Sequence, residues 1–281
     1  MTRKTFLRLL ALVLGGFAMP LSSSASTRER APAFFVGHGS PINAVETNAF
    51  TRSLRELGQS LQRPKAVLVV SAHWTPPYYG VSVHESPDLI YDFFGFPQAL
   101  YEVRYPAANA AFLTPAMQKL LPALQVKERG LDHGAWSVLL HLFPDADVPV
   151  MQLGINSTLS LREHFEVGRR LRVLRQQGVM IIGSGNVTHN LQATAMAQDA
   201  PAVGWALDFD RFVKEAIEKR DFEALIGFEE RNSFARTAHP TLEHYIPLLY
   251  AAGASFDDDE SRFVYEGMEH GSLSMRSWLL R

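Results

Sequence analysis

Apolar residues along this chain form short continuous runs, separated by stretches in which they recur at helical spacing. Four of the runs are rich in β-branched residues: AFFVG (33–37), AVLVVSA (66–72), VPVMQLGI (148–155) and VMIIGSG (179–185). A strand buried on both faces of a parallel sheet has this continuous pattern, whereas a half-exposed strand alternates. We therefore predict four central strands of a largely parallel sheet.

Between these runs, apolar residues recur every three or four positions, as on one face of a helix. Such stripes run from Phe50 to Leu61, from Leu161 to Leu174 and from Phe209 to Ile217. Alternating strands and helices predict an α/β fold: a single domain with a mostly parallel central sheet flanked by helices. A late strand and turn are expected in FVYEGMEHGSLSMRSWL (263–279).

The first residues have the pattern of a targeting segment. A basic start with Arg3, Lys4 and Arg8 precedes an apolar stretch too short for a membrane span, and small residues lead up to Ala25. We predict a signal peptide over 1–25, a linker over 26–31 and one domain over 32–281. An amphipathic first helix is the alternative, which the lack of acidic residues in this stretch disfavours.

The leader also suggests where the protein acts. TRKTFLR (2–8) resembles a twin-arginine export signal, with lysine in the place of the second arginine. We expect an exported protein, periplasmic and with no stable membrane span after processing, or a cytoplasmic one if the leader is not used.

Composition removes several kinds of chemistry. The 281 residues include no cysteine, so disulfides, thiolate nucleophiles and thiolate metal sites are excluded. The net charge of −2 gives no reason to expect binding to nucleic acid. The sequence indicates no oligomeric state.

Histidines follow three of the predicted strands. His38 comes directly after the first, His73 after the second and His189 shortly after the fourth. Ligands of open α/β sheets bind beyond the carboxyl ends of the strands, so these side chains should converge. Neutral imidazole is a common metal ligand, and glycines at 37, 39, 183 and 185 allow close backbone approach. We predict a metal site there, although a lone histidine in such a place is more often structural.

Two more segments add candidates. His133 stands just before an apolar helical stretch, and HPTLEHYIPLL (239–249) offers Glu243 and His244. If Pro240 takes the first helical position, a helix N-terminus aims Glu243 or His244 at the site. Glu243 could equally be a carboxylate that favours the helix dipole, and His239 is expected to be solvated near the N-cap.

The other histidines are given weaker roles. We interpret His141 and His164 as structural residues of helices, His84 as part of an edge strand, and His270 as a residue near the pocket. The aromatic segment 92–106 is either a packed lid or in contact with a substrate ring. Trp74 and Trp136 are candidates for a pocket wall, and Arg104 for binding a substrate carboxylate.

A set of histidines, with or without one carboxylate, suits zinc or non-haem iron. The residues alone do not separate oxygen chemistry from hydrolysis. A zinc hydrolase with Glu243 as general base, and a non-enzymatic binding protein, are therefore alternatives.

The motifs also carry a family resemblance. FFVGHGSP, VVSAHW, DFFGFPQALYEVRYPA, LDHGAW, GSGNVTHN and HPTLEHYIPLLYAAGA, in this order from about residue 32 to the C-terminus, resemble class III extradiol ring-cleavage dioxygenases. The likeness is to the bacterial 4,5-DOPA extradiol dioxygenase branch. The exported leader departs from that branch, whose members are usually cytoplasmic.

The resemblance implies cleavage of a catechol ring beside its two hydroxyls, with a small aromatic diol and O2 as substrates. It implies one divalent metal ion, Fe(II) for catalysis or Zn(II) as bound. By position, His38, His73 and His244 match metal ligands, and His189 matches either a ligand or an acid/base. His133 matches an acid/base histidine, and Glu243 is the candidate for the glutamate ligand of other branches.

Overall fold

The computed structural model describes residues 30–84 and 89–281. The predicted signal peptide and most of the predicted linker lie outside the described residues. Within the described ranges, no helix is both long enough and apolar enough to cross a bilayer. Arg30 and Ala31 already contact the domain, because Arg30 pairs with Asp258 at 2.7 Å and the Ala31 amide donates to the Arg175 carbonyl.

The described residues form one large sheet of eight strands and a separate pair of short strands. The strands are β1 (Ala33–Gly37), β2 (Ala66–Ser71), β3 (Gly80–Val83), β4 (Gln125–Glu128), β5 (Val150–Leu153), β6 (Val179–Gly185), β7 (Ser261–Tyr265), β8 (Met268–Glu269), β9 (Leu273–Ser274) and β10 (Ser277–Leu280). The order in the large sheet is β4-β3-β5-β2-β6-β1-β10-β7. Its four central strands, β5, β2, β6 and β1, are mutually parallel, which confirms the predicted fold class.

The four predicted apolar runs are these four central strands. β1 and β6 have the predicted bounds, while β2 and β5 are shorter than expected. The predicted late strand is also present: β10 pairs antiparallel with β1, and β7 forms the sheet edge beside it. The edge-strand assignment around His84 is wrong, because β3 lies between β5 and β4 and His84 follows its end.

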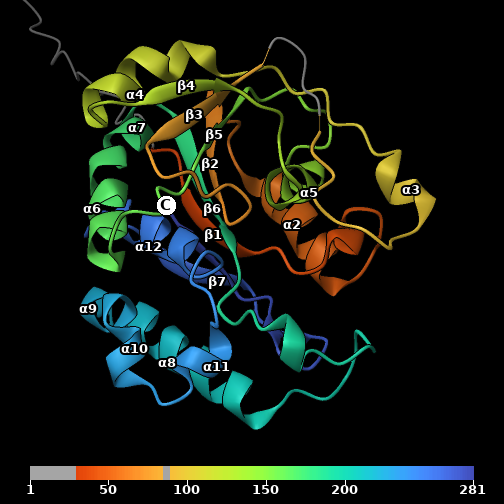
Figure 1. The fold of residues 1–281 in the computed structure, drawn as a ribbon. Helices are drawn as coiled ribbons and strands as arrows, with labels where there is room; N and C mark the ends of the chain where they lie inside the picture. Colours follow the sequence, from red (N-terminus) through yellow and green to blue (C-terminus); the bar gives the residue numbers. More distant parts are fainter. Residues whose placement is uncertain (1–29, 85–88) are drawn as a thin grey trace, which may run out of the picture.

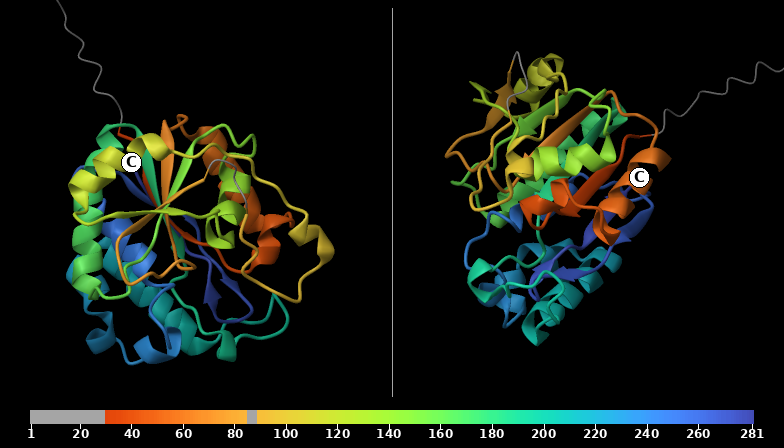
Figure 2. Two further views of the ribbon diagram at one scale, coloured as in Figure 1. Left: turned by 45° about the horizontal axis from the view of Figure 1, so that its top comes forward. Right: turned by 90° about the vertical axis from the view of Figure 1, so that its right-hand side faces the viewer.

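Helices cover both faces of the sheet (Figures 1 and 2). The helices are α2 (Ala49–Ser60), α3 (Gln98–Tyr101), α4 (Thr114–Leu120), α5 (His133–Leu142), α6 (Leu161–Leu171), α7 (Val173–Gln176), α8 (Gly204–Glu218), α9 (Phe222–Ile226), α10 (Phe228–Arg231), α11 (Ala235–Ala238) and α12 (Ile246–Gly253). In Figure 1, α6 and α12 lie on one side of the central strands and α2 and α5 on the other. The helices α8 to α11 pack together below the sheet in that view.

The continuous apolar pattern of the strands follows from this double cover. In β1, Phe35 packs into the core under α6 and α12, while Phe34 packs into the core under α2 and α5. In β2, Leu68 packs into the first of these two cores and Val69 into the second. Because successive side chains of a strand point to opposite faces, both faces need apolar residues when both are covered.

The predicted start of the last helix is wrong. Pro240 lies in a bend, and α12 begins at Ile246 with Pro247 in its first turn. The preference for proline in the first turn holds, but it applies to the second proline of the segment. Residues 243–245 form the turn that leads into the helix.

Candidate metal centre and active site

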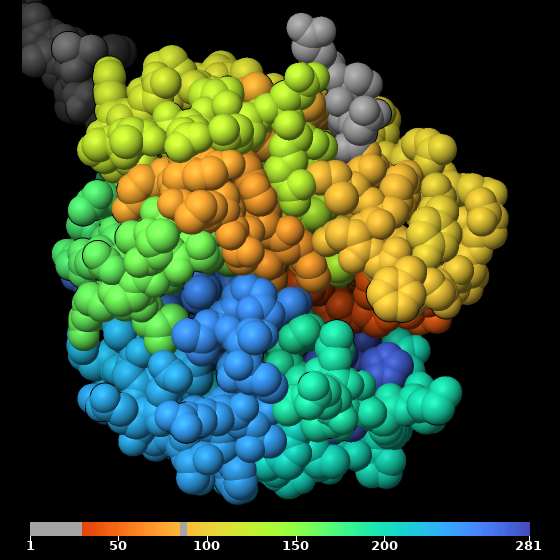
Figure 3. Space-filling view, viewed as in Figure 1, coloured from red at the N-terminus to blue at the C-terminus, as the bar shows by residue number. Residues whose placement is uncertain are grey.

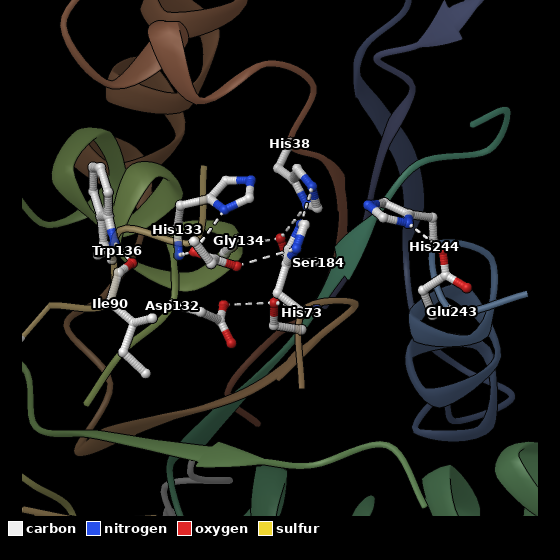
Figure 4. A network of polar contacts seen from close by, with 12 residues as sticks. His38, His73, Ile90, Asp132, His133, Gly134, Trp136, Ser184, Glu243 and His244 are labelled. Carbon is white, nitrogen blue, oxygen red and sulfur yellow. Dashed lines mark hydrogen bonds and ion pairs between the residues drawn. The ribbon is translucent and has the colours of Figure 1, made fainter. Parts of the chain in front are cut away.

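The carboxyl ends of the central strands bring the predicted histidines together (Figure 4). His38 follows β1 directly, His73 stands two residues after β2, and His133 is the first residue of α5. His244 comes from the turn before α12, where its carbonyl accepts the Asn186 amide just past β6 at 2.9 Å. Segments far apart in the sequence thus meet at one end of the sheet.

Three imidazoles form a compact cluster. One ring nitrogen from each of His38, His73 and His244 lies within 4.8 Å of the other two, which is the spacing of a possible metal site. The Nε2 atoms of His38 and His73 are 3.1 Å apart. The Nε2 atom of His244 is buried and has no hydrogen-bond partner. The cluster therefore presents nitrogen atoms to a common space.

Each of these three rings is held through its other nitrogen. His38 Nδ1 lies 2.9 Å from Ser184 Oγ, His73 Nδ1 lies 3.3 Å from Asp92 Oδ2, and His244 Nδ1 lies 3.1 Å from Glu243 Oε1. A histidine that binds a metal through one nitrogen commonly donates the other N–H to such a partner, which fixes the ring and its tautomer.

The partner of His38 defines its tautomer. Ser184 Oγ donates its only proton to the Gly134 carbonyl at 2.5 Å, so it accepts from His38 Nδ1. The carboxylate of Asp92 lies 3.3 Å from His73 Nδ1, where its negative charge favours a proton on that nitrogen. When both rings are neutral, two nitrogen lone pairs face each other at 3.1 Å, and a cation between them removes the repulsion. The donor set thus fits a divalent ion with imidazole ligands.

Burial keeps these rings neutral. It lowers the pKa of His73 to about 3 and that of His189 to about 4. It also lowers the pKa of His38 and His244 well below the usual range, and neighbouring imidazoles act in the same direction. Neutral imidazole is the form that ligates metals, so ligand lone pairs are available at neutral pH without displacing protons.

Asp92 joins a ligand candidate to the predicted acid/base histidine. Its Oδ1 accepts from His133 Nδ1 at 2.9 Å and from the His133 amide at 3.1 Å, while Oδ2 faces His73 Nδ1. The centroids of the His73 and His133 rings are 3.9 Å apart. Sequence reasoning missed Asp92, which appeared only as one polar residue at the start of an aromatic run.

His189 lies beside the cluster in a different orientation. Its ring is stacked on that of His244, with 3.4 Å between centroids and 4° between planes. Imidazole lone pairs lie in the ring plane, so those of two stacked rings lie in nearly parallel planes and do not point at one another's metal position. His189 is not one of the three clustered residues, but it forms a second possible metal-binding group with Glu243 and His244, whose ligand atoms also lie within 4.8 Å of one another.

A buried polar network around Asp132 holds the backbone segments that carry His73 and His133. The carboxylate of Asp132 accepts from Ser71 Oγ at 2.7 Å, from Arg129 Nη2 at 3.2 Å and from Gln152 Nε2. Ser71 Oγ in turn accepts the His73 amide at 3.2 Å. Asp132 also precedes α5 as its N-cap residue, so one buried side chain connects the segment bearing His73 with the start of α5.

Glycines allow the elements to approach closely at this end of the sheet. A Cβ on Gly185 would lie 2.1 Å from the His244 carbonyl oxygen, and one on Gly183 would lie 2.2 Å from that of Pro247. At these two positions the predicted close approach exists, and the partner is the segment that enters α12.

The remaining histidines lie outside the cluster. The expectation of a solvated His239 is wrong, because its ring is buried and Nε2 lies 2.7 Å from the Val187 carbonyl. His141 and His164 are buried in α5 and α6, as predicted. His270 is close to the Ala195 carbonyl through Nδ1.

The aromatic segment near Asp92 packs against the acid/base candidate. The Phe93 ring lies 5.6 Å from that of His133 and 6.1 Å from that of Trp136. Trp136 is fully buried and donates to the Ile90 carbonyl, so it is a core residue and not a pocket wall. Arg104 donates to Tyr91 Oη and to the backbone carbonyls of Tyr101 and Val103.

On the face shown in Figure 3, orange, yellow, blue and teal segments meet. A cavity of about 690 Å³ lies between the chain after β5, the first turn of α6 and residues 241–246. Glu243, which holds His244, lines that cavity.

Comparison with known proteins identifies the family. Residues 32–275 match the model for the catalytic LigB subunit of aromatic ring-opening dioxygenase. The chain belongs to this family. It is therefore an aromatic ring-opening dioxygenase by family, and the zinc-hydrolase and binding-protein alternatives are not favoured.

Individual relatives agree with this assignment. The chain is 43% identical over 255 residues to the 4,5-DOPA dioxygenase extradiol of Escherichia coli K12, which covers 88% of this chain and 94% of the relative. It is 36% identical to the protein of the same name from Beta vulgaris, over 87% and 94% of the two chains. The crystal structure of an uncharacterised protein from Escherichia coli K12 matches with a TM-score of 0.79 and 37% identity, covering 90% of this chain and all of the other.

Proposed function

We propose that this dioxygenase opens the ring of a catechol beside its two hydroxyl groups, consuming O2, with one divalent metal ion held by His38, His73 and His244. The observation that carries the proposal is the convergence of these three rings, each with Nδ1 held by a partner. LigB-type dioxygenases are metal dependent, and three protein ligands leave room for the two catechol oxygens and for O2. We propose Fe(II) as the catalytic ion, with Zn(II) able to bind the same ligands.

The surrounding side chains have separate tasks in this proposal. When bound, the ion supplies the Lewis acidity that favours ionised catechol and the redox chemistry that activates O2. His133, held by Asp92 through Nδ1, accepts a catechol proton at its other ring nitrogen. His189, stacked on His244, returns a proton as the ring opens.

The substrate class rests on the relatives. Several are named for 4,5-DOPA, and we propose a DOPA-like or related aromatic diol for this chain. The cavity of about 690 Å³ beside Glu243 has room for a side chain that extends from the catechol ring.

Oxygen uptake tests the activity directly. Protein prepared without oxygen and loaded with Fe(II) is mixed with L-DOPA, caffeate or protocatechuate, and O2 consumption and the visible spectrum are recorded together. We expect a yellow ring-cleavage product in step with O2 consumption for at least one of the three. Absence of O2 uptake with a broad panel of catechols would refute the proposed function.

We further propose that the protein is exported, on the strength of the basic and apolar pattern of residues 1–25. Expression of the whole chain followed by fractionation and mass measurement of the N-terminus tests this. Mature protein that begins after Ala25 in the periplasmic fraction is the expected result, and full-length protein confined to the cytoplasm would contradict it.

A further inference from the structure

We propose that Asp92 is a positioning residue that fixes the tautomers of two histidines at once, the metal ligand His73 and the acid/base His133. This inference rests on the proposed function for the roles of the two histidines. It goes beyond that function by assigning their shared orientation to a single carboxylate.

Three nitrogens of two histidines face the two oxygens of this carboxylate. Oδ1 accepts both the backbone amide of His133, at 3.1 Å, and its Nδ1–H, at 2.9 Å. Oδ2 lies 3.3 Å from His73 Nδ1. An ionised carboxylate only accepts hydrogen bonds, so it selects the Nδ1–H tautomer in each ring.

The selected tautomers are the ones that the proposed chemistry needs. With its proton on Nδ1, His73 directs an Nε2 lone pair toward Nε2 of His38, 3.1 Å away. His133 likewise keeps Nε2 unprotonated and able to take a proton from the substrate. A positive charge that then develops on His133 lies next to the Asp92 carboxylate, as in other pairs of histidine and aspartate.

The carboxylate that makes these contacts is itself only partly exposed, with 25% of its side chain accessible.

The aromatic run around Asp92 explains how it is held in place. The Ile90 amide donates to the Leu131 carbonyl at 2.7 Å, and Trp136 Nε1 donates to the Ile90 carbonyl at 3.1 Å. Tyr91 Oη donates to the Val103 carbonyl at 2.7 Å. Ile90 therefore attaches the segment to α5 and to the turn before it, and Tyr91 attaches it to the chain at Val103. After Asp92, the Phe93 ring packs 5.6 Å from that of His133. The packing of the aromatic residues of this segment thus fixes the position of the Asp92 carboxylate.

Replacement of Asp92 by asparagine should affect its two histidine partners differently. The amide of an Asp92→Asn side chain has one acceptor oxygen, and His133 offers two donors at the Oδ1 position. The amide NH2 must then face His73 Nδ1, where it cannot accept a proton. The His73 ring loses its Nδ1–H partner while that of His133 keeps it. Alanine at this position removes the acceptor for both rings.

The test measures Zn(II) affinity by chelator competition, and ring tautomers by long-range ¹H–¹⁵N spectra of histidine-labelled, Zn(II)-loaded protein. We expect Asp92→Asn to weaken Zn(II) binding by about 10–100-fold while the His133 Nδ1–H signature remains. Asp92→Ala should weaken Zn(II) binding at least as much and also let His133 populate both tautomers. Asp145→Asn, the same change at an exposed aspartate that pairs with Arg63, is the matched control and should change neither readout.

Unchanged Zn(II) affinity and unchanged ring spectra in Asp92→Asn would overturn the proposal, whatever happens to Asp92→Ala. Loss of the His133 signature in Asp92→Asn would also contradict it, because the remaining acceptor would then not serve His133. Neither readout uses a substrate. If the wild-type protein cleaves no catechol, the proposed function fails and the result for Asp92 still stands.

Discussion

The rings of His189 and His244 lie parallel, 3.4 Å apart between centroids, at the edge of the histidine cluster. The two residues come from different elements, one from the chain after β6 and the other from the turn before α12. Stacking places the ring of His189 beside the candidate ligand His244 and fixes the plane of its ring. The two proposed roles of His189, ligand and proton donor, therefore have different consequences when it is replaced.

For His189→Gln we expect Zn(II) or Fe(II) binding to change by less than about threefold, while the rate of ring cleavage falls by about 10²–10⁴-fold, the usual contribution of a positioned acid or base. Metal content and O2 uptake measured on the same preparation check this. Loss of the metal from His189→Gln would instead identify it as a ligand. His270→Gln is a matched change at a histidine outside the cluster and should affect neither quantity.

Replacement of any of His38, His73 and His244 by alanine should remove the ion. Each change deletes a nitrogen from the cluster of three, and the loss should exceed the 10–100-fold effect typical of residues that only orient a ligand. Metal content after dialysis and O2 uptake with a catechol measure the outcome. A variant that keeps a full complement of tightly bound metal would exclude that histidine from the ligand set.

Glu243 is expected to orient His244 rather than to bind the ion. Its Oε1 faces His244 Nδ1 at 3.1 Å and also accepts from Thr241 Oγ1 at 2.9 Å. We expect Glu243→Gln to weaken metal binding by about 10–100-fold and to retain oxygen chemistry when metal is in excess. Glu229→Gln, which alters another carboxylate of the adjoining cavity, is the control. Complete loss of O2 uptake with saturating metal would contradict an orienting role.

Gly185→Ala should displace the backbone that carries His244 and so weaken metal binding. A Cβ there would lie 2.1 Å from the His244 carbonyl oxygen, so the turn that carries His244 must move. We expect a loss of about 1–3 kcal/mol in the free energy of unfolding, together with weaker metal binding. Denaturant unfolding and metal titration measure the two effects. Gly204→Ala is the control, because a Cβ at that helical position meets nothing within 4 Å and should not destabilise the protein.

Stability should fall as the pH drops below 6.5, in part because of His164. Burial lowers the pKa of His164 from 6.5 to about 4, so the unfolded chain binds a proton at pH values where the folded chain does not. The stabilising effect of the neutral ring is therefore complete above pH 6.5 and is lost between 6.5 and 4. We expect His164→Gln to reduce the loss between pH 7 and pH 4 by roughly 3 kcal/mol. Urea unfolding at several pH values measures this, and an unchanged pH dependence would refute it.

The sequence predicted the sheet well for a specific reason. Strands covered on both faces need apolar residues on both, and the continuous apolar runs that became β1, β2, β5 and β6 have this pattern. The histidines that follow strand ends could be placed near one another from the same pattern, because the carboxyl ends of parallel strands share one edge.

Local patterns did not decide contacts made across the fold. His239 looks solvated in the sequence, yet its ring is buried against the Val187 carbonyl after the chain folds back on β6. No sequence motif marks Asp92, because its role depends on which ring nitrogens face its two oxygens in the folded chain. The start of α12 was misjudged since two prolines in one segment satisfy the same rule.

The position of β6 between β1 and β2 has a consequence for the timing of metal uptake. β1 and β2 do not pair with each other, and both pair with β6, whose last residue is Gly185. The ring of His244 arrives still later in the chain. During synthesis the three ligands thus have no common space until most of the polypeptide has been made and folded. The compartment in which folding is completed supplies the first ion that this centre meets.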